Sequence, residues 1–293
     1  AALRQGYLAV KSGLVDVALV VGVEKFTDMV DSGVEDALAT ATDSDFEAVQ
    51  GLTPTSQAAM LMQRYMHEFD VPADGFAGFP ITAHANAVDN PNAMFRSPIK
   101  ESTYLRAGMV SPPLNMFDAA PPADGAAAVI LTRPELLPSD KQHRNVRILG
   151  SASASDMLTL HDRHDPLTFD AARRSVERAL EKAGVSLGHI SFFEYHDAYS
   201  IYAALSLEAA GFAERGKGWQ WARDNEIAAG GRIPCAIEGG LKARGFPGGA
   251  TGVYQVVEAA SRLRSTSKSG EVAMIQSLGG PAATAVTHIL TGA

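Results

Sequence analysis

A helical pattern that leads through a glycine into a nearly continuous apolar stretch occurs twice in this sequence, once near each end. The first copy joins a helix over 2–12 to the apolar segment 15–23, and the second joins a helix over 252–263 to the segment 271–275. Long apolar stretches rich in β-branched residues are typical of strands that are buried on both faces. The pattern therefore predicts a layered α/β fold in which each copy supplies a helix and a buried strand.

A second pair of matching segments follows in the same order and indicates an internal duplication. The stretch 124–131 resembles the stretch 280–290. Aligning Val17 with Val272 shifts the sequence by 255 residues, whereas aligning Leu131 with Leu290 shifts it by 159. The first half therefore carries about 96 additional residues between its two matched strands, and inserted segments of this length usually cover a functional site.

The duplication divides the chain into two expected halves. Residues 1–145 form the N-terminal half, which we expect to be truncated at its start because the helix at Ala1 has no capping residue before it. An inserted loop domain occupies about 25–117, and its clearest helix pattern is 55–69, with Thr55 or Ser56 as the cap. Residues 146–293 form the C-terminal half. Its expected strands are 146–151 and 190–194, and its expected helices are 170–183 and 201–210.

Charge and composition exclude several classes of function. The chain has a net charge of −8 and a pI near 5.5 without runs of basic residues, which argues against binding nucleic acid or an anionic membrane. No apolar run approaches the roughly 20 residues that a bilayer span needs. A single cysteine, Cys235, fits a reducing compartment, so we expect a cytoplasmic protein. The His-Asp run over 161–165 is typical of a solvated loop, and we expect no metal site there.

Residues that could carry chemistry follow three of the expected strands. These segments are 194–199, which contains His196 and Tyr199, the glycine-rich segment 239–252, and the segment 276–281. Open α/β sheets bind their ligands at the carboxyl ends of strands. Glycine-rich turns can leave backbone N–H groups free for an oxyanion or a phosphate. The alternative is that these glycines only make tight turns.

An ordered set of motifs resembles the thiolase superfamily along essentially the whole chain. The motifs are Ala1–Val10 with Gly22–Lys25, Asp124–Ala128, His196–Tyr199, Gly239–Gly252 and Gly279–Gly280. The resemblance is to the branch that contains sterol-carrier-protein-type and archaeal thiolases. It implies two similar βαβαβαββ halves, with a loop domain inserted in the first half and sheet layers flanking central helices. That fold would account for both the duplication and the insertion.

The resemblance also implies roles for individual residues. His196 matches the family histidine that helps to form an oxyanion hole. Tyr199 and Glu238 are expected near the same crevice as acid–base groups, although Tyr199 could instead be a packed aromatic residue and Glu238 a solvated turn residue. The remaining expected contacts to substrate or coenzyme A are Gly245, Phe246, Gly249, Ala250, Gly279 and Gly280.

Departures from the family pattern leave the reaction open. The position of the family's nucleophilic cysteine precedes Ala1, and Cys235 does not match it. The family's Gly-His-Pro is replaced by Gly245-Phe246-Pro247, so the histidine that activates the nucleophile is absent. The first expectation is a thiolase-like acyl-CoA C-acyltransferase. The alternatives are a retro-aldolase that acts on a β-hydroxy acyl-CoA, and a catalytically silent acyl-CoA-binding subunit of a complex.

The resemblance further implies the partners of the chain. The expected substrate is a coenzyme A thioester, with no permanently bound cofactor. We expect a homodimer, and a small OB-fold, zinc-ribbon acyl-CoA-binding protein as a further partner.

Overall fold

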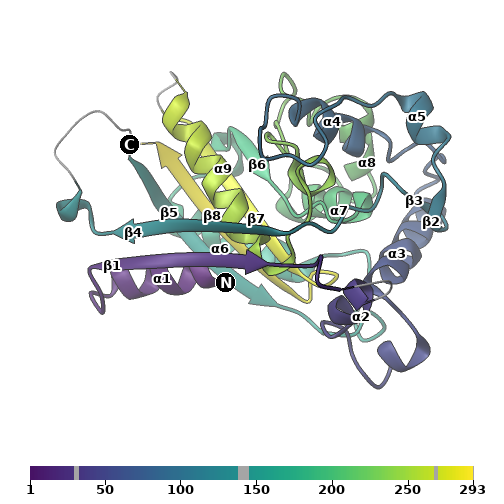
Figure 1. Ribbon diagram of the computed structural model, residues 1–293, viewed down its shortest axis with the longest axis horizontal. Coiled ribbons are helices and arrows are strands. Elements are labelled where there is room, and N and C mark those ends of the chain that lie inside the picture. The colour runs from purple at the N-terminus through teal and green to yellow at the C-terminus, as the bar shows by residue number, and fades with distance from the viewer. Residues whose placement is uncertain (30–32, 138–144, 267–269, 293) are drawn as a thin grey trace.

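The computed structural model describes residues 1–29, 33–137, 145–266 and 270–292 and shows a mixed α/β architecture (Figure 1). The helices are α1 (Ala2–Lys11), α2 (Gly33–Ala39), α3 (Pro54–Glu68), α4 (Gly78–Asn86), α5 (Glu101–Leu105), α6 (Asp170–Ala183), α7 (Ser200–Ala210), α8 (Gly218–Arg223) and α9 (Thr251–Ser265). The strands are β1 (Val17–Glu24), β2 (Met109–Ser111), β3 (Leu114–Asn115), β4 (Gly125–Thr132), β5 (Val146–Ser155), β6 (Phe192–Glu194), β7 (Val272–Gly279) and β8 (Thr284–Gly292).

The C-terminal half contains a four-stranded sheet with the order β5-β8-β7-β6. Strand β8 pairs antiparallel with both β5 and β7, and β6 pairs parallel with β7. A parallel bridge between Phe193 and Cys235 extends the sheet beyond β6. Helix α6 packs against β5 and β8, and α9 packs against β7 and β8. This half therefore follows the alternation of strands and helices that the sequence predicts.

The antiparallel hairpin β1–β4 of the N-terminal half has the same register as β7–β8. Val17 pairs with Thr132 in the first hairpin, and the aligned residues Val272 and Thr291 pair in the second. Each of the eight pairs in β1–β4 corresponds to a pair in β7–β8. Helices α1 and α9 lie between the two hairpins, and Leu3 of α1 shares a buried cluster with residues of α9, β1 and β7. The predicted layers of sheet around central helices are confirmed.

One face of the β1–β4 hairpin corrects the expectation that the segment 15–23 is buried on both sides. The side chains of Val17, Leu19, Val21 and Val23 are exposed on that face, together with Ile130 of β4. Helices α1 and α9 contact β1 and β4 on the opposite face, where Val20 is buried. Among the described residues, nothing covers the outer face of this hairpin as α6 covers β8. An apolar sequence pattern does not reveal whether a covering element is present.

The inserted segment contains more helix than its one clear sequence pattern indicates, because α2, α4 and α5 accompany α3 (Figure 1). The cap of α3 is Thr53, which accepts a hydrogen bond from the Ser56 backbone, rather than Thr55 or Ser56. Pro54 at the first helical position explains this start, since its fixed φ suits a first turn that needs no N–H donor. Thr55 is therefore free to serve another purpose.

Helix α7 lies in the middle of the main hydrophobic core and fixes the position of the candidate site. Its sequence is apolar on all sides, and nine of its eleven residues are buried, as expected for a helix surrounded by other elements. It contacts α3, α4, α6 and α8. Tyr199 is the extended residue immediately before its first turn. None of the described helices combines the length and the apolar character that a membrane crossing requires.

Candidate active site

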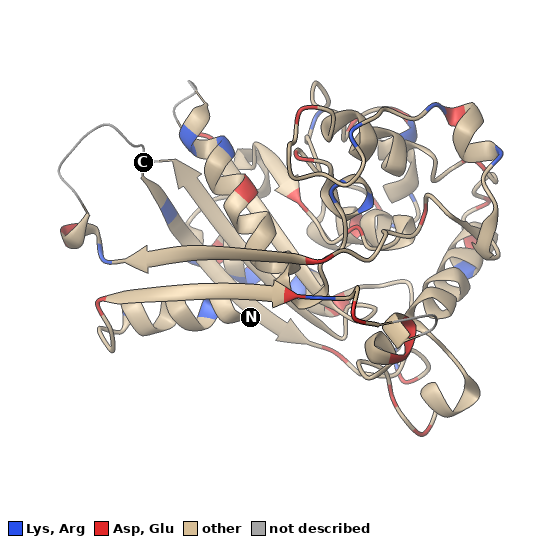
Figure 2. Ribbon diagram, viewed as in Figure 1, with Lys and Arg blue, Asp and Glu red and all other residues tan. Residues whose placement is uncertain are grey.

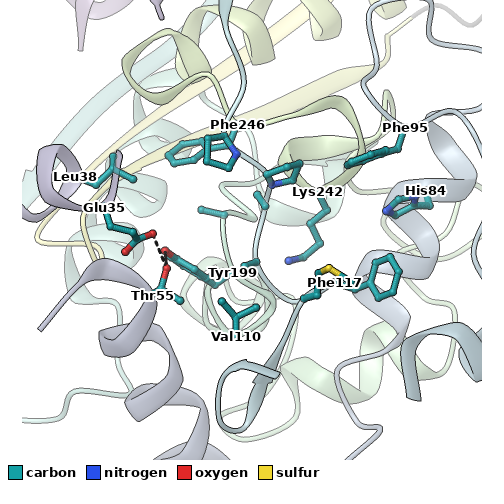
Figure 3. Close-up of a pocket in the computed structure, with 16 residues that line it drawn as sticks. Glu35, Leu38, Thr55, His84, Phe95, Val110, Phe117, Tyr199, Lys242 and Phe246 are labelled. Atoms are coloured by element: carbon teal, nitrogen blue, oxygen red, sulfur yellow. Dashed lines mark hydrogen bonds between the residues drawn. The ribbon is translucent and has the colours of Figure 1, made fainter. Parts of the chain in front are cut away.

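A cavity of about 520 Å³ opens beside the start of α7. Its walls come from the inserted segment, from the loop before β4 and from the segment that follows Gly239 (Figure 3). Most of the lining is apolar, and the residues with polar side chains are Glu35, Thr55, His84, Tyr199 and Lys242. The cavity thus combines an apolar volume with a small number of groups that can exchange protons, as substrate sites commonly do.

Tyr199, Thr55 and Glu35 form a chain of hydrogen bonds along one wall of the cavity (Figure 3). The Tyr199 hydroxyl lies 2.9 Å from the Thr55 Oγ1 atom. The Thr55 hydroxyl donates to Oε1 of Glu35 at 2.8 Å. Because threonine has one hydroxyl proton and Thr55 gives it to Glu35, Tyr199 must be the donor to Thr55. The phenol oxygen therefore keeps its lone pairs for a group in the cavity.

The electrostatic environment keeps the Tyr199 phenol protonated. Burial raises the pKa of Tyr199 above its usual value, and the nearby charge of Glu35 raises it further, while the hydrogen bond with Thr55 opposes the shift. The Oε2 atom of Glu35 is buried without a hydrogen-bond partner among the described residues. A proton that enters the chain at Tyr199 therefore has a carboxylate at the far end to accept it.

Lys242 reaches the cavity from the opposite side. It belongs to a short π-helical segment, Gly240–Arg244, whose residues are all buried, and such segments often occur at functional sites. Figure 3 shows its amine pointing into the space between Tyr199 and Phe117. Burial lowers the pKa of Lys242 to about 8, although the charges of Asp197 and Asp118 favour the protonated form.

His196 and Phe246 lie together next to the cavity, but only Phe246 lines it. Their rings meet edge to face with centroids 5.6 Å apart. Burial, assisted by the charge of Arg244, lowers the pKa of His196 to about 4, so its imidazole is neutral near pH 7. A neutral imidazole donates one N–H, and the buried Nδ1 of His196 has no partner among the described residues. The predicted oxyanion role of His196 stays a prediction.

The glycine-rich segment packs closely against other side chains at Gly245. Gly245 has a φ of +116°, and a Cβ there would lie 2.8 Å from the Cβ of Ala123, so glycine is required. The N–H groups of Gly245, Phe246, Gly249 and Ala250 donate within the protein, to Leu241, Pro121, Glu24 and Pro247 respectively. A role for these N–H groups in binding a substrate would require them to change partners.

Several predicted site residues lie outside the cavity. Glu238 is half-buried near Glu258 and Arg262, and burial raises its pKa. The sequence predicts that the segment 276–281 follows a strand. Strand β7 continues through Gly279, however, so only Gly280 and Pro281 follow it. Neither these residues nor Gly245, Gly249 and Ala250 line the cavity. Their roles stay predictions.

Cys235 is fully buried, and its thiol donates to the Ile233 carbonyl at 3.2 Å. Burial raises the pKa of the thiol well above its usual value. A buried thiol of this kind is not a nucleophile, in agreement with its mismatch to the family position.

Sequence reasoning does not identify four of the polar residues in the cavity, which are Glu35, Thr55, His84 and Lys242. Thr55 resembles a helix cap, and Glu35 lies in a part of the insertion with no recognisable pattern. Lys242 lies within the glycine-rich motif, where the glycines dominate the interpretation. Residues 35, 55, 199 and 242 come together only through the packing of the insertion on the C-terminal half, so spacing along the chain could not reveal them.

Comparison with known proteins agrees with this architecture. Residues 152–292 match the family described as "Thiolase C-terminal domain-like". The chain is 38% identical to "Acetyl-CoA acetyltransferase" of Methanothermobacter thermautotrophicus over 99% of its own length and 76% of that protein. It is 27% identical to "17-hydroxy-3-oxo-4-pregnene-20-carboxyl-CoA lyase" of Mycobacterium tuberculosis, over 91% of this chain and 71% of the lyase.

A solved structure gives the same result for the fold. The chain superposes on the "Ltp2-ChsH2(DUF35) aldolase" with a TM-score of 0.85 and 23% identity, covering 99% of this chain and 76% of that one. The duplicated hairpins, the central helices and the sequence similarity to the acetyltransferase together show that this chain belongs to the thiolase superfamily.

Proposed function

We propose that this protein cleaves the Cα–Cβ bond of a β-hydroxy acyl-CoA by a retro-aldol reaction. The observation that carries the proposal is the Tyr199–Thr55–Glu35 chain, which presents a phenol oxygen to the cavity and a carboxylate acceptor behind it. A retro-aldol reaction begins with removal of a proton from the β-hydroxyl group. The three residues supply a path for that proton without a covalent intermediate.

The proton path and the bond changes balance in one step. The substrate hydroxyl gives its proton to the Tyr199 oxygen, Tyr199 passes its own proton to Thr55, and Thr55 passes its proton to Glu35. The β-carbon becomes a carbonyl carbon as the Cα–Cβ bond breaks, and the bonding electrons form the enolate of the thioester. Reversal of the relay, or a proton from solvent, then converts the enolate into the acyl-CoA product.

We assign the enolate oxygen to His196, which lies beside the cavity against Phe246 and whose buried Nδ1 has no partner among the described residues. A neutral imidazole offers an N–H donor without bringing a second charge, and its lowered pKa keeps it neutral across the physiological range. The substrate in this proposal is a coenzyme A thioester, and no permanently bound cofactor takes part.

The names of two similar proteins support this reaction. The mycobacterial relative is named a carboxyl-CoA lyase, and the structural neighbour is named an aldolase. Phe246 supports it as well, because a phenyl ring cannot accept the proton of a nucleophilic thiol.

Acyl transfer is the second candidate, because the relative with 38% identity is named an acetyl-CoA acetyltransferase. That reaction needs a nucleophile and a base. Replacing Phe246 with His restores the base of the family pattern, so thiolysis of a 3-oxoacyl-CoA by the Phe246→His variant, and not by the parent protein, would favour descent from an acyltransferase. Efficient thiolysis by the unmodified protein would overturn the retro-aldol proposal.

The proposal is tested by removing the relay and following cleavage of 3-hydroxyacyl-CoA thioesters of increasing acyl bulk. Thr55→Val breaks the path while nearly keeping the shape of the side chain, and we expect a loss of about 10²–10⁴ in kcat. Thr55→Ser keeps the hydroxyl and should retain most of the activity. Thr42→Val is the matched control, because the Thr42 hydroxyl donates to the Ala39 carbonyl outside the cavity. Equal rates for the Val and Ser variants of Thr55 would contradict the relay.

We further propose that the chain works with a small OB-fold, zinc-ribbon acyl-CoA-binding protein and forms a homodimer. The name of the structural neighbour joins two components, Ltp2 and ChsH2, which supports an assembly with a partner subunit. Co-purification with a small partner and light scattering at micromolar concentration test the two parts separately. A fully active monomer that needs no partner would contradict both the homodimer and the partner subunit. A cytoplasmic location also stays a prediction.

A further inference from the structure

Lys242 is a buried amine whose hydrogen-bonding capacity is largely unused. Its side chain is 2% exposed. The Nζ atom donates to the backbone carbonyl of Asp118 at 2.6 Å, and among the described residues no other hydrogen bond of this amine is found. An ammonium group carries three donors. Leaving donors unsatisfied in an apolar environment is costly, so the site favours either a ligand oxygen or the neutral amine.

The neighbouring carboxylates do not use the remaining donors. Asp118 accepts hydrogen bonds at Oδ2 from the Tyr104 hydroxyl and the Asn115 backbone. Asp197 accepts at Oδ1 from the Leu241 backbone. The charges of both carboxyl groups favour the protonated form of Lys242. The ring of His84, on another wall of the cavity, opposes that form when it is protonated. Lys242 therefore lies near two carboxyl groups, and no hydrogen bond from its amine to either of them is found among the described residues.

The cavity in front of the amine suits an uncharged ligand. Phe117, Val110 and Phe246 are among the apolar groups that line it (Figure 3). Because two acidic groups already balance the charge of Lys242, an anionic ligand would meet no net positive field. A ligand with an apolar body and a neutral oxygen, such as a ketone or an aldehyde, matches both the walls and the amine.

We propose that Lys242 captures a ketone or an aldehyde in this cavity as a Schiff base. The neutral amine attacks the carbonyl carbon and forms a carbinolamine, in which a proton has moved from nitrogen to oxygen. Loss of water then forms the C=N bond, and both amine protons leave with that water. The step involves no oxidation or reduction, and a buried lysine with a lowered pKa is the kind of residue that performs it.

This inference is related to the proposed function but does not require it. A retro-aldol reaction releases a carbonyl compound in the same cavity, so Lys242 would hold the product or supply the carbonyl partner for the reverse reaction. Adduct formation and cleavage activity are measured separately. A protein that forms the adduct without cleaving 3-hydroxyacyl-CoA would contradict only the proposed function, and the reverse result would contradict only the role of Lys242.

The experiment is reductive trapping with 2-heptanone and sodium cyanoborohydride, followed by peptide mapping by mass spectrometry. We expect a heptyl adduct at Lys242 whose yield rises with pH around a midpoint near 8. Exposed lysines such as Lys217 serve as internal controls, because Lys217 lies on the surface and does not line this cavity. An acyl-CoA that occupies the cavity should reduce labelling of Lys242 and leave Lys217 unchanged.

Two variants separate chemistry from folding. Lys242→Arg keeps a positive charge beside Asp118 and Asp197 but cannot form an imine, so it should lose the cavity adduct and retain the adducts at exposed lysines. Tyr104→Phe removes the hydroxyl that donates to Asp118, keeps the amine and should still be labelled. The inference is overturned if Lys242 of the folded wild-type protein is labelled no faster than Lys217 at pH 8, a result that does not depend on any variant.

Discussion

The hairpins β1–β4 and β7–β8 are equivalent in register but differ in their surroundings. Leu19 pairs with Ile130 in the first hairpin, and the aligned residues Met274 and Ile289 pair in the second. Ile130 is 70% exposed, whereas Ile289 is fully buried. In the C-terminal half, α6 packs on β8, and Ile289 belongs to the main core.

The difference shows that pairing and burial have separate causes. Backbone pairing and apolar side chains produce the same hairpin in both halves. Whether its outer face is buried depends on a helix contributed from elsewhere in the chain. Figure 2 shows that charged residues lie at the ends of β1 and not along its length. The outer face of this hairpin is therefore as apolar as its buried counterpart.

The largest expected effect comes from shortening the two equivalent isoleucines. Ile289→Ala should reduce the free energy of unfolding by about 2–5 kcal/mol, since it opens a cavity in the core. Ile130→Ala should change it by less than about 0.5 kcal/mol, because the side chain is already in water. Urea unfolding of both variants measures the contrast. Similar losses would mean that the outer face of β1–β4 is covered in solution.

An acid-sensitive difference follows from His288 of β8, whose counterpart in β4 is Val129. Burial lowers the pKa of His288 to about 3, and the charge of Arg4 lowers it further. The unfolded chain therefore binds a proton that the folded chain refuses. Above pH 6.5 His288 does not reduce the free energy of unfolding. Below pH 6.5 the free energy of unfolding falls progressively as the pH approaches 3.

The variant His288→Val gives the second hairpin the residue of the first. In the wild-type protein, protonation of the unfolded His288 should lower the free energy of unfolding by about 2 kcal/mol between pH 7 and pH 5, at roughly 1.4 kcal/mol per pH unit below 6.5. His288→Val should remove this loss. His189→Gln is the control, since His189 is exposed. The measurement is the unfolding free energy from pH 7 to 4, and an unchanged slope in His288→Val would refute the assignment.

The smallest expected effect is on the exposed face itself. Leu19→Lys places a charge where the wild-type side chain is 66% exposed, and we expect less than about 0.5 kcal/mol of change in unfolding free energy. Binding of an apolar dye should decrease. A loss above about 2 kcal/mol, together with a change in mass by light scattering, would instead assign this face to an interface between subunits.

The candidate site is partly accessible to sequence reasoning. The motif His196–Tyr199 points to Tyr199, and the glycine-rich motif contains Phe246, both of which line the cavity. Glu238 carries the same kind of signal and lies elsewhere, because a turn directs a side chain according to its local packing. Glu35 and Lys242 give no signal, since their function depends on neighbours that are distant in sequence.

The sequence by itself determined the family, the two matched strand pairs and most helices and strands of the C-terminal half. The helix α6 begins and ends at the expected residues, Asp170 and Ala183, because side-chain periodicity and the terminating Gly184 act over a few residues. Only the tertiary structure decided which apolar face is covered and which polar groups meet in the cavity. Burial, pKa shifts and the hydrogen bond from Tyr199 to Thr55 arise from contacts between segments 144 residues apart, and such contacts exist only once the halves have packed.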